Sequence, residues 1–331
     1  MRIKSSNHIK HFVWIVFIAL TTACGTTQPE MQIEIKECAK MPYPRATAVS
    51  FSIGSKAYVF GGRDSLGNYL NDIWQYNSTT DKWINLGPTP LASRVNAIAC
   101  VQGDSVYIGL GFAHSAVYAP ESYLHDWWCW TPSTNTWTQL ARYPYTSTVK
   151  PITYALESHI YAIYGTADCF TRDITYYDIP TNSWHILKDN HRRARAAFSG
   201  VGATCQGQTF YGLGYNTSNL TQWFTMNLEE DYWVKCKSIP GKGRTCSACC
   251  SGDKYIYVFG GRNFGGELSG GEVFADILRY DHQKDNWTYL GLMPCGEAEN
   301  QISFRLGKNI YFGLGENKNG KIFNSLYCFE E

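Results

Sequence analysis

The sequence predicts an all-β protein, a six-bladed β-propeller with four antiparallel strands in each blade. Three observations support this fold. A glycine-ended strand signal occurs six times, an aromatic strand signal lies downstream of each copy, and in five repeats a tryptophan follows the aromatic strand at a constant distance. These tryptophans lie 47 to 54 residues apart. A repeat of about 50 residues is typical of a propeller blade, and a closed ring of blades leaves no long exposed sheet edge.

The glycine-ended signal is a short apolar strand that begins with tyrosine. Its copies are Tyr58–Gly62, Tyr107–Gly111, Tyr161–Gly165, Tyr211–Gly214, Tyr257–Gly261 and Tyr311–Gly315. The third copy lacks the first glycine of the pair. Glycine at the end of a strand permits backbone angles that other residues resist, so each copy predicts a strand followed by a loop.

The aromatic signal predicts the next strand of each repeat. Five copies are Asp72–Tyr76, Asp126–Trp130, Asp173–Tyr177, Gln222–Met226 and Asp276–Tyr280. Eleven residues after the first residue of each copy stand Trp83, Trp137, Trp184, Trp233 and Trp287. The tryptophan marks a further strand, so each repeat contains four strands, a, b, c and d, in chain order.

The sixth repeat is expected to be completed from the N-terminal side. Its aromatic strand begins at Ser325, and the matching tryptophan would fall at position 336, beyond Glu331. Ile35, Cys38 and Pro42 have the spacings of three and seven residues that Trp83, Leu86 and Pro90 show. We therefore expect an N-terminal strand, about residues 32–38, to close the last blade, with Ile35 buried in the tryptophan position.

The glycine pair, the tyrosine of strand c and the tryptophan of strand d form a recognisable signature. Six residues separate Tyr76 from Trp83 and Tyr280 from Trp287. With these residues the chain resembles the kelch-repeat family over residues 32–331. The resemblance implies a kelch propeller. The motif itself is structural, so the function has to be sought in the loops.

The first residues resemble a bacterial lipoprotein signal. A basic start is followed by the apolar run Phe12–Leu20, which is too short to span a bilayer, and by small residues and Cys24. We expect a signal peptide over residues 1–23, a lipid on Cys24 that anchors the chain to a membrane, a tether over 24–31 and the propeller over 32–331. These features predict a lipoprotein of the bacterial cell envelope, periplasmic or at the outer membrane. An ordinary secretory signal is the alternative.

Charge and cysteine spacing argue against several classes of function. Loss of residues 1–23 removes three basic residues and no acid from totals of 29 and 28, which leaves a net charge of −2. Such a chain has no basic field for nucleic acid. Cys246, Cys249 and Cys250 come closest to a metal cluster, but they lie in an alternating stretch of small residues that indicates a buried strand. The sequence predicts neither a metal site nor a cofactor.

Basic residues gather where the strand directions bring loops to one face. Antiparallel strands place the d-to-a connections and the b-to-c loops on the same side. Arg45, Arg94, Arg195 and Arg244 precede strand a in four repeats, Arg63 and Arg262 follow glycine pairs, and Lys150 and Glu299 fill the related regions of repeats three and six. Guanidinium groups bind carboxylates through paired hydrogen bonds, so this mouth predicts a site for an anionic glycan or an acidic protein segment. The alternative is that the arginines are structural and join neighbouring loops.

Two long loops, 112–124 with His114 and 262–274, are expected on the same face. Trp127, Trp128 and Trp130 resemble a stacking platform for sugar, but their alignment with strand c of the first repeat favours packing between blades. The fold is also similar to that of the sialic acid mutarotases. That resemblance implies arginines for the sugar carboxylate, with His114 and Glu299 available as acid and base. We expect a binding module, with an epimerase or mutarotase of acidic sugars such as sialic acid as the alternative.

Overall fold

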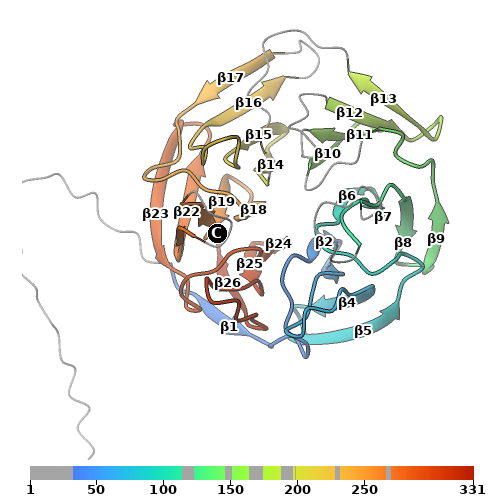
Figure 1. Cartoon of the computed structure of the whole chain (residues 1–331), viewed down its shortest axis with the longest axis horizontal. Coiled ribbons are helices and arrows are strands. Elements are labelled where there is room, and N and C mark those ends of the chain that lie inside the picture. Colours follow the sequence, from blue (N-terminus) through green and yellow to red (C-terminus); the bar gives the residue numbers. More distant parts are fainter. Residues whose placement is uncertain are drawn as a thin grey trace, which may run out of the picture. The chain divides into compact units, whose positions relative to one another are not determined.

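The computed structural model describes residues 33–113, 123–145, 151–163, 174–187, 197, 199–227, 232–265 and 270–331. These residues form six four-stranded antiparallel sheets, arranged as blades around a central axis (Figure 1). Among them there is no helix that could cross a membrane. The prediction of an all-β, six-bladed propeller is confirmed.

Strands a to d of each blade run from the axis outward (Figure 1). Blade 1 contains β2 (Val49–Ile53), β3 (Lys56–Phe60), β4 (Asp72–Asn77) and β5 (Lys82–Pro88). Blade 2 contains β6 (Ile98–Gln102), β7 (Ser105–Gly109), β8 (Trp127–Thr131) and β9 (Thr136–Gln139). Blade 3 contains β10 (Ile152–Leu156), β11 (His159–Ile163), β12 (Ile174–Asp178) and β13 (Ser183–Leu187).

The second half of the chain repeats this plan. Blade 4 contains β14 (Val201–Cys205), β15 (Gln208–Gly212), β16 (Trp223–Asn227) and β17 (Tyr232–Cys236). Blade 5 contains β18 (Ala248–Ser251), β19 (Tyr255–Phe259), β22 (Asp276–Asp281) and β23 (Asn286–Leu292), with the small hairpin β20 (Arg262–Asn263) and β21 (Glu272–Val273) in its b-to-c loop. Blade 6 contains β24 (Ile302–Leu306), β25 (Asn309–Gly313), β26 (Leu326–Glu330) and, from the other end of the propeller, β1 (Lys36–Cys38).

The N-terminal strand closes the ring. In the antiparallel pair of β1 and β26, Lys36 lies opposite Cys328 and Cys38 lies opposite Leu326. The predicted closure of the last blade is therefore confirmed, although β1 is shorter than the predicted strand over 32–38. The prediction that Ile35 is buried is wrong: it precedes β1 and is half-buried, because the outermost strand has a neighbouring blade on one side and solvent beyond its edge.

The tyrosine–tryptophan signature fastens one blade to the next. In blade 1 the ring centroids of Tyr76 and Trp83 are 5.0 Å apart, and the Tyr76 hydroxyl donates to Asp81 at 2.7 Å. Asp81 also accepts the backbone N–H of Ala39, which follows β1 of blade 6, at 2.8 Å. Trp83 Nε1 donates to the carbonyl of Ala39, also at 2.8 Å. The signature thus satisfies both backbone groups of a residue in the neighbouring blade.

The same clamp recurs in two further blades. In blade 3 it consists of Tyr177, Asn182 and Trp184, which hold Ala141 of blade 2, and in blade 5 of Tyr280, Asp285 and Trp287, which hold Lys237 of blade 4. In blade 2, Trp130 stands in the tyrosine position and stacks on Trp137 at 5.2 Å. Trp127 and Trp130 are buried and Trp128 is half-buried, so packing explains these tryptophans, as predicted.

A second set of bonds joins the inner ends of the blades. Two residues before strand a stand Thr47, Asn96, Ser199, Cys246 and Asn300, all with φ between 53° and 57°. Along the ring, the backbone N–H of one residue donates to the backbone carbonyl of its counterpart in the next blade. Asn96 donates to Thr47, Thr47 to Asn300, Asn300 to Cys246 and Cys246 to Ser199, at 2.9 to 3.3 Å. This chain of bonds links blades 2, 1, 6, 5 and 4. It supports a left-handed backbone conformation that non-glycine residues seldom adopt.

Deletion of residues 24–40 is expected to collapse the yield of soluble protein, because it removes β1 and leaves the edge of β26 unpaired beside an apolar core. The measurement is the soluble fraction after expression, with the midpoint of thermal unfolding for any soluble material. The reference is the deletion of residues 24–30, which also lacks Cys24 but keeps β1, so it should give a high soluble fraction and the wild-type unfolding midpoint. If the longer deletion also unfolds at the wild-type temperature, β1 does not close the ring.

Candidate functional site

Two sets of loops form one face of the propeller, which we call the mouth. Isolated β-bridges join the connection before strand a to the loop after strand b of the same blade. The bridged pairs are Ala46 with Arg63, Val95 with Phe112, Thr245 with Arg262 and Glu299 with Glu316. The two sets of loops therefore share a face, as the strand directions predict.

Three of the predicted mouth arginines lie inside the blades. The side chains of Arg45, Arg94 and Arg244 are at most 2% exposed. Each guanidinium donates two hydrogen bonds to the aspartate at the start of strand c in the same blade, with N–O distances of 2.6 to 3.1 Å. The prediction that these three arginines face solvent is wrong, because each pairs inside the blade with a half-buried carboxylate.

The Arg45 pair shows the chemistry of this contact. Its Nη1 donates to Asp72 at 2.9 Å and to the carbonyl of Gly61 at 3.1 Å, and Trp74 Nε1 donates to the same carboxylate at 2.6 Å. Burial alone raises the pKa of Asp72, but the hydrogen bonds and the charge of Arg45 outweigh it and hold the pKa below the ordinary value of 3.8. The carboxylate is ionised at neutral pH, and its arginine is fully buried, so a ligand at the mouth does not reach the guanidinium.

The arginine before strand a and the aspartate at the start of strand c are present or absent together in each blade for which the structure describes both positions. Blades 1, 2 and 5 have the pairs Arg45–Asp72, Arg94–Asp126 and Arg244–Asp276, whereas blades 4 and 6 have Ala197 with Gln222 and Ala298 with Ser325. Arg195 is therefore not the counterpart of Arg45 that the spacing predicted. The connection from Trp184 to strand a of blade 4 is two residues longer than in the other blades, so Ala197 occupies the position.

Four charged residues form two ion pairs across the mouth of blades 5, 6 and 1. Arg262 donates through Nε to both carboxylate oxygens of Glu299, at 2.8 and 3.0 Å, and these hydrogen bonds raise the pKa of Arg262. Arg63 pairs with Glu316, which also accepts the amide of Asn300 at 3.1 Å. The predicted residues Arg262 and Glu299 thus neutralise each other. Their side chains are less than a tenth exposed, whereas that of Arg63 is 31% exposed.

Sequence reasoning missed Glu316, although a signal was present. Glu316 directly follows the last glycine of the sixth glycine-ended strand, the position that Arg63 and Arg262 hold in their blades. The predicted residues His114, Lys150 and Arg195, and the predicted lipid site Cys24, lie outside the described residues.

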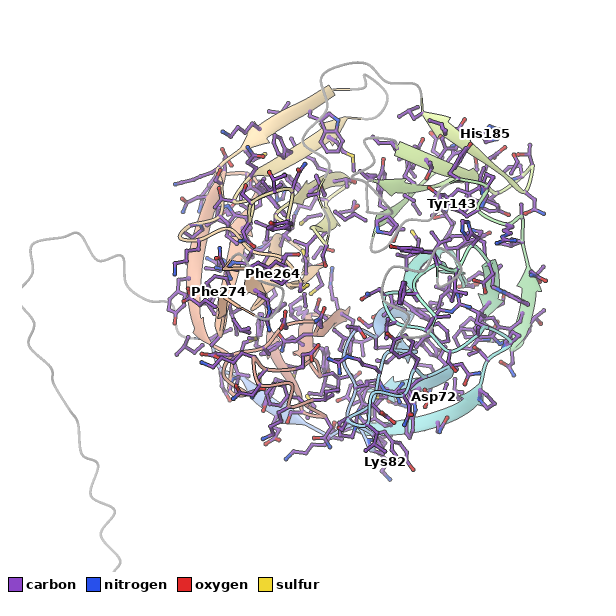
Figure 2. The ribbon with its side chains drawn as sticks, in the orientation of Figure 1. Asp72, Lys82, Tyr143, His185, Phe264 and Phe274 are labelled. Atoms are coloured by element: carbon purple, nitrogen blue, oxygen red, sulfur yellow. The ribbon has the colours of Figure 1, made fainter. Side chains whose placement is uncertain are left out.

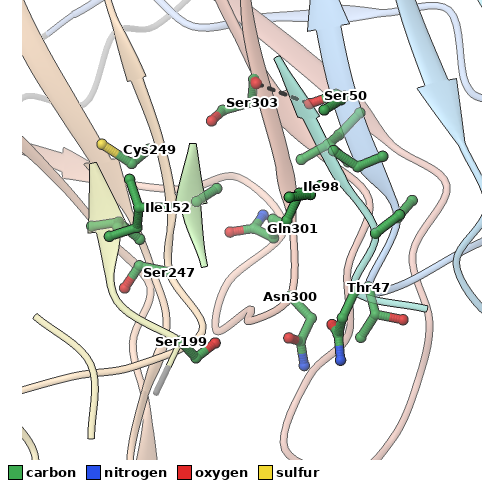
Figure 3. Close-up of a pocket in the computed structure, with 18 of the residues that line it drawn as sticks. Thr47, Ser50, Ile98, Ile152, Ser199, Ser247, Cys249, Asn300, Gln301 and Ser303 are labelled. Atoms are coloured by element: carbon green, nitrogen blue, oxygen red, sulfur yellow. Dashed lines mark hydrogen bonds between the residues drawn. The ribbon is translucent and has the colours of Figure 1, made fainter. Parts of the chain in front are cut away.

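A central cavity of about 280 Å³ opens between the inner strands. Its wall consists of the first residues of strand a from every blade, and Figure 3 shows Thr47, Asn300 and Gln301 around it. Deeper positions carry the small side chains of Ser50, Ala99, Thr153, Gly202, Cys249 and Ser303. Among the residues that the structure describes, the lining contains no charged side chain, so this part of the cavity is neutral and polar.

Two acceptor oxygens of this lining have no hydrogen-bond partner among the described residues. They are Oδ1 of Asn96 and Oε1 of Gln301. Gln301 is only 7% exposed, so water replaces a partner poorly at this position. Both oxygens are themselves closed off from solvent, so a ligand that brings N–H or O–H donors reaches them when the neighbouring side chains shift.

Aromatic side chains border the mouth above blades 4 and 5. Asn219 of blade 4 and Phe264 of the blade 5 loop exchange two hydrogen bonds, from the Phe264 N–H to Asn219 Oδ1 at 3.0 Å and from Asn219 Nδ2 to the Phe264 carbonyl at 2.9 Å. The ring of Phe264 lies edge-to-face with that of Tyr215, with centroids 5.7 Å apart. Figure 2 labels Phe264 and Phe274 over blade 5. Both Tyr215 and Phe264 are half-buried, so this loop pair presents an ordered aromatic surface.

The cysteines of blade 5 are packing residues. Cys249 and Cys250 lie on β18, as the predicted strand required. Burial raises the pKa of Cys250 to about 12 and that of Cys249 well above its ordinary value, so both thiols are protonated at neutral pH. No cluster of potential metal ligands is present in the described part of the chain.

Comparisons with known proteins support a family assignment. A family model described as the KLHDC2/KLHL20/DRC7 Kelch-repeats domain matches residues 21–214, and a Kelch motif matches residues 243–294. Kelch-like protein 25 of Xenopus tropicalis is 25% identical over 269 residues, which are 79% of this chain and 43% of that protein. Kelch-like protein 35 of Mus musculus is 23% identical over 320 residues, 94% of this chain and 51% of that protein. The chain thus spans about half the length of these relatives.

Replacement of Arg94 by methionine is expected to lower the free energy of unfolding by about 3–5 kcal/mol, because it leaves Asp126 partly buried without its cation. Urea denaturation measures the loss. The double variant Arg94→Met with Asp126→Leu removes both charges and should recover most of it. If the single variant is as stable as the wild type, the pair is not structural.

The Arg45–Asp72 pair also predicts a stability change in acid. Because the folded-state pKa of Asp72 is lowered, its contribution is complete above 3.8 and is lost as pH falls through the lower folded value. The urea midpoint of the wild type should therefore drop more than that of Asp72→Asn between about pH 5 and pH 3. Equal drops in the two proteins would contradict this role.

Proposed function

The chain belongs to the family of the KLHDC2/KLHL20/DRC7 Kelch-repeats domain, and we propose that it is a binding module that holds a segment of a protein partner at the mouth of its central cavity. Kelch propellers bind ligands and protein partners as a class. A propeller provides rigid strands and presents loops from several blades to one partner, which is a common basis for specificity.

One observation supports this site above the others: the unpaired acceptors of Asn96 and Gln301 in the neutral cavity. A buried acceptor without a donor is unfavourable by about 1–3 kcal/mol, so a donor from a partner gains affinity there. A peptide segment offers such donors in its backbone N–H groups and in side-chain amides. The small residues below the rim leave room for a side chain to enter.

The aromatic border on blades 4 and 5 provides a second contact. Tyr215 and Phe264 are held by the Asn219 bonds and are half-buried, so little conformational entropy is lost when a partner packs on them. Ordered aromatic residues beside a polar cavity are typical of the energetically important part of a protein interface.

The charges of the mouth bear on the class of ligand. Arg45, Arg94 and Arg244 are buried in ion pairs, and Arg262 is paired with Glu299. An anionic glycan or acidic peptide would have to compete with these carboxylates for the guanidinium groups. The geometry of the described residues therefore favours a neutral, hydrogen-bonding segment over an anion.

The same pairing weakens the case for a mutarotase of acidic sugars. Such an enzyme needs a free acid and a free base near the sugar ring and free arginines for its carboxylate. Glu299 is 5% exposed and bonded to Arg262. A binding function needs none of these groups to be free.

We retain the membrane anchor at Cys24 as a separate proposal that rests on the sequence alone. The basic start, the apolar run Phe12–Leu20 and the small residues before Cys24 support it. A lipid on Cys24 would attach the module to a membrane of the cell envelope.

Peptides selected from a random phage library on the immobilised wild-type protein provide the test of the site. We expect Asn96→Leu and Gln301→Leu each to raise the Kd of a selected peptide about tenfold, which corresponds to the loss of one hydrogen bond to a buried group. Surface plasmon resonance measures the Kd. Thermal unfolding verifies that the variants are folded.

Two controls distinguish the possible outcomes. Lys56 lies on the opposite face, beside a hollow of about 620 Å³. The variant Lys56→Ala should therefore leave the Kd unchanged. Arg63→Ala should also have little effect. Selection of acidic peptides that lose binding in Arg63→Ala, but keep it in Asn96→Leu, would instead establish an anion site.

Replacement of Cys24 by serine tests the anchor. We expect the wild type in the membrane fraction after cell lysis and Cys24→Ser in the soluble fraction, because a bound lipid supplies the membrane affinity. Immunoblots of the two fractions measure the distribution. An unchanged membrane fraction in Cys24→Ser would contradict a lipid at this position.

A further inference from the structure

The seam between β1 and β26 joins two parts of the chain that lie far apart in sequence. Each of these strands contributes one cysteine, Cys38 from β1 and Cys328 from β26. Cys38 lies opposite Leu326, and Cys328 lies opposite Lys36. The two cysteines are therefore diagonal neighbours, two positions apart, and their side chains point to the same face of the sheet.

The diagonal geometry is within reach of a disulfide. Diagonal Cα atoms of an antiparallel pair are about 7–8 Å apart, slightly beyond the usual upper limit for a disulfide, so the bond needs a small movement of one strand. The two thiols lie close enough for the side chain of each to interact with the other. β1 has three residues and forms the edge of its sheet, so it can move the short remaining distance.

Cys38 and Cys328 share one environment. Both are half-buried and both pack against the core cluster between blades 6 and 1. A disulfide is an apolar group of similar volume, so it fits the face that the two thiols already cover. Part of each side chain remains open to solvent, where a small oxidant can approach.

Cys328 has the reactivity that disulfide exchange requires. The thiol of Cys38 hydrogen-bonds to its sulfur, and with the charge of Lys36 this lowers the pKa of Cys328 to about 7, although burial opposes the change. The pKa of Cys38 is raised. Burial raises the pKa of Cys100 to about 12 and that of Cys295 to about 11. At neutral pH a large fraction of Cys328 is thiolate, the form that attacks a disulfide.

We propose that Cys38 and Cys328 form a disulfide that closes the propeller covalently. The thiolate of Cys328 attacks a small-molecule disulfide, forms a mixed disulfide and releases one thiolate. Cys38 then loses its proton, attacks the sulfur of Cys328 and releases the second thiolate. Two protein thiols are oxidised, and one small disulfide is reduced to two thiols that take up the two protons.

The position of this cross-link gives it a large effect on stability. It joins residues 38 and 328 and so encloses all six blades in one covalent loop. A disulfide that closes a long loop removes the most conformational freedom from the unfolded chain. It also prevents β1, a three-residue edge strand, from leaving the sheet.

The full chain, purified in dithiothreitol, is treated with oxidised glutathione and then alkylated and digested. We expect mass spectrometry to identify one dominant linked pair, the peptides with Cys38 and Cys328. Differential scanning fluorimetry should give a Tm roughly 5–10 °C higher for the oxidised than for the reduced wild type.

Three serine variants make the test specific. Cys38→Ser and Cys328→Ser should lose both the linked peptide and the Tm difference between oxidised and reduced protein. Cys129→Ser is the matched control, because Cys129 holds the same position in strand c of blade 2 but lies opposite Thr138. It should keep both. A different linked pair in the wild type, or a Tm difference that persists in Cys328→Ser, would overturn the proposal.

Discussion

Closure of the ring is the constraint on which the rest of the structure depends. Each blade is a small sheet whose faces are covered by its neighbours, so one open seam exposes apolar surface on two blades. Different interactions join neighbouring blades at the outer strands and near the central axis. The clamps built around Trp83, Trp184 and Trp287 join the outer strands of neighbouring blades. Around the cavity, the backbone N–H groups of Thr47 and Asn300 donate to carbonyls of the next blade. The site is rigid because its wall is part of this ring.

Burial of charged side chains within the blades determines which charges remain available to a ligand at the mouth. An arginine that enters a blade is stable there only with a carboxylate and backbone acceptors around it, as Arg45 has in Asp72 and Gly61. Blades 4 and 6 lack both members of the pair, which agrees with this requirement. A chain with many arginines near its mouth can therefore present a neutral cavity, and residue type alone does not identify its ligand.

The sequence was sufficient for the fold because the fold is a sum of local, repeated patterns. Six glycine-ended strands predicted six blades. The spacing of Ile35, Cys38 and Pro42 repeats that of Trp83, Leu86 and Pro90, and it predicted the closing strand. The burial of the arginines was not predicted, because Arg45 and Asp72 are 27 residues apart and neither repeat position by itself shows that the two side chains pair within one blade. The prediction for Arg195 was wrong for a related reason. The connection before strand a of blade 4 has two extra residues, so the spacing from the tryptophan no longer identifies the counterpart of Arg45, and the strand boundaries are needed to find it.

Blade 6 combines the seam of the ring with the residues of the site. It has Ala298 in place of the buried arginine, and it carries Glu299, Asn300 and Gln301 at the mouth. Its outermost strand comes from the other end of the propeller, so the position of these residues depends on how firmly β1 is held. Glu299 and Glu316 tie the same blade to Arg262 of blade 5 and to Arg63 of blade 1. These two ion pairs belong to the ring rather than to the cavity lining, because they join blade 6 to both of its neighbours at the mouth.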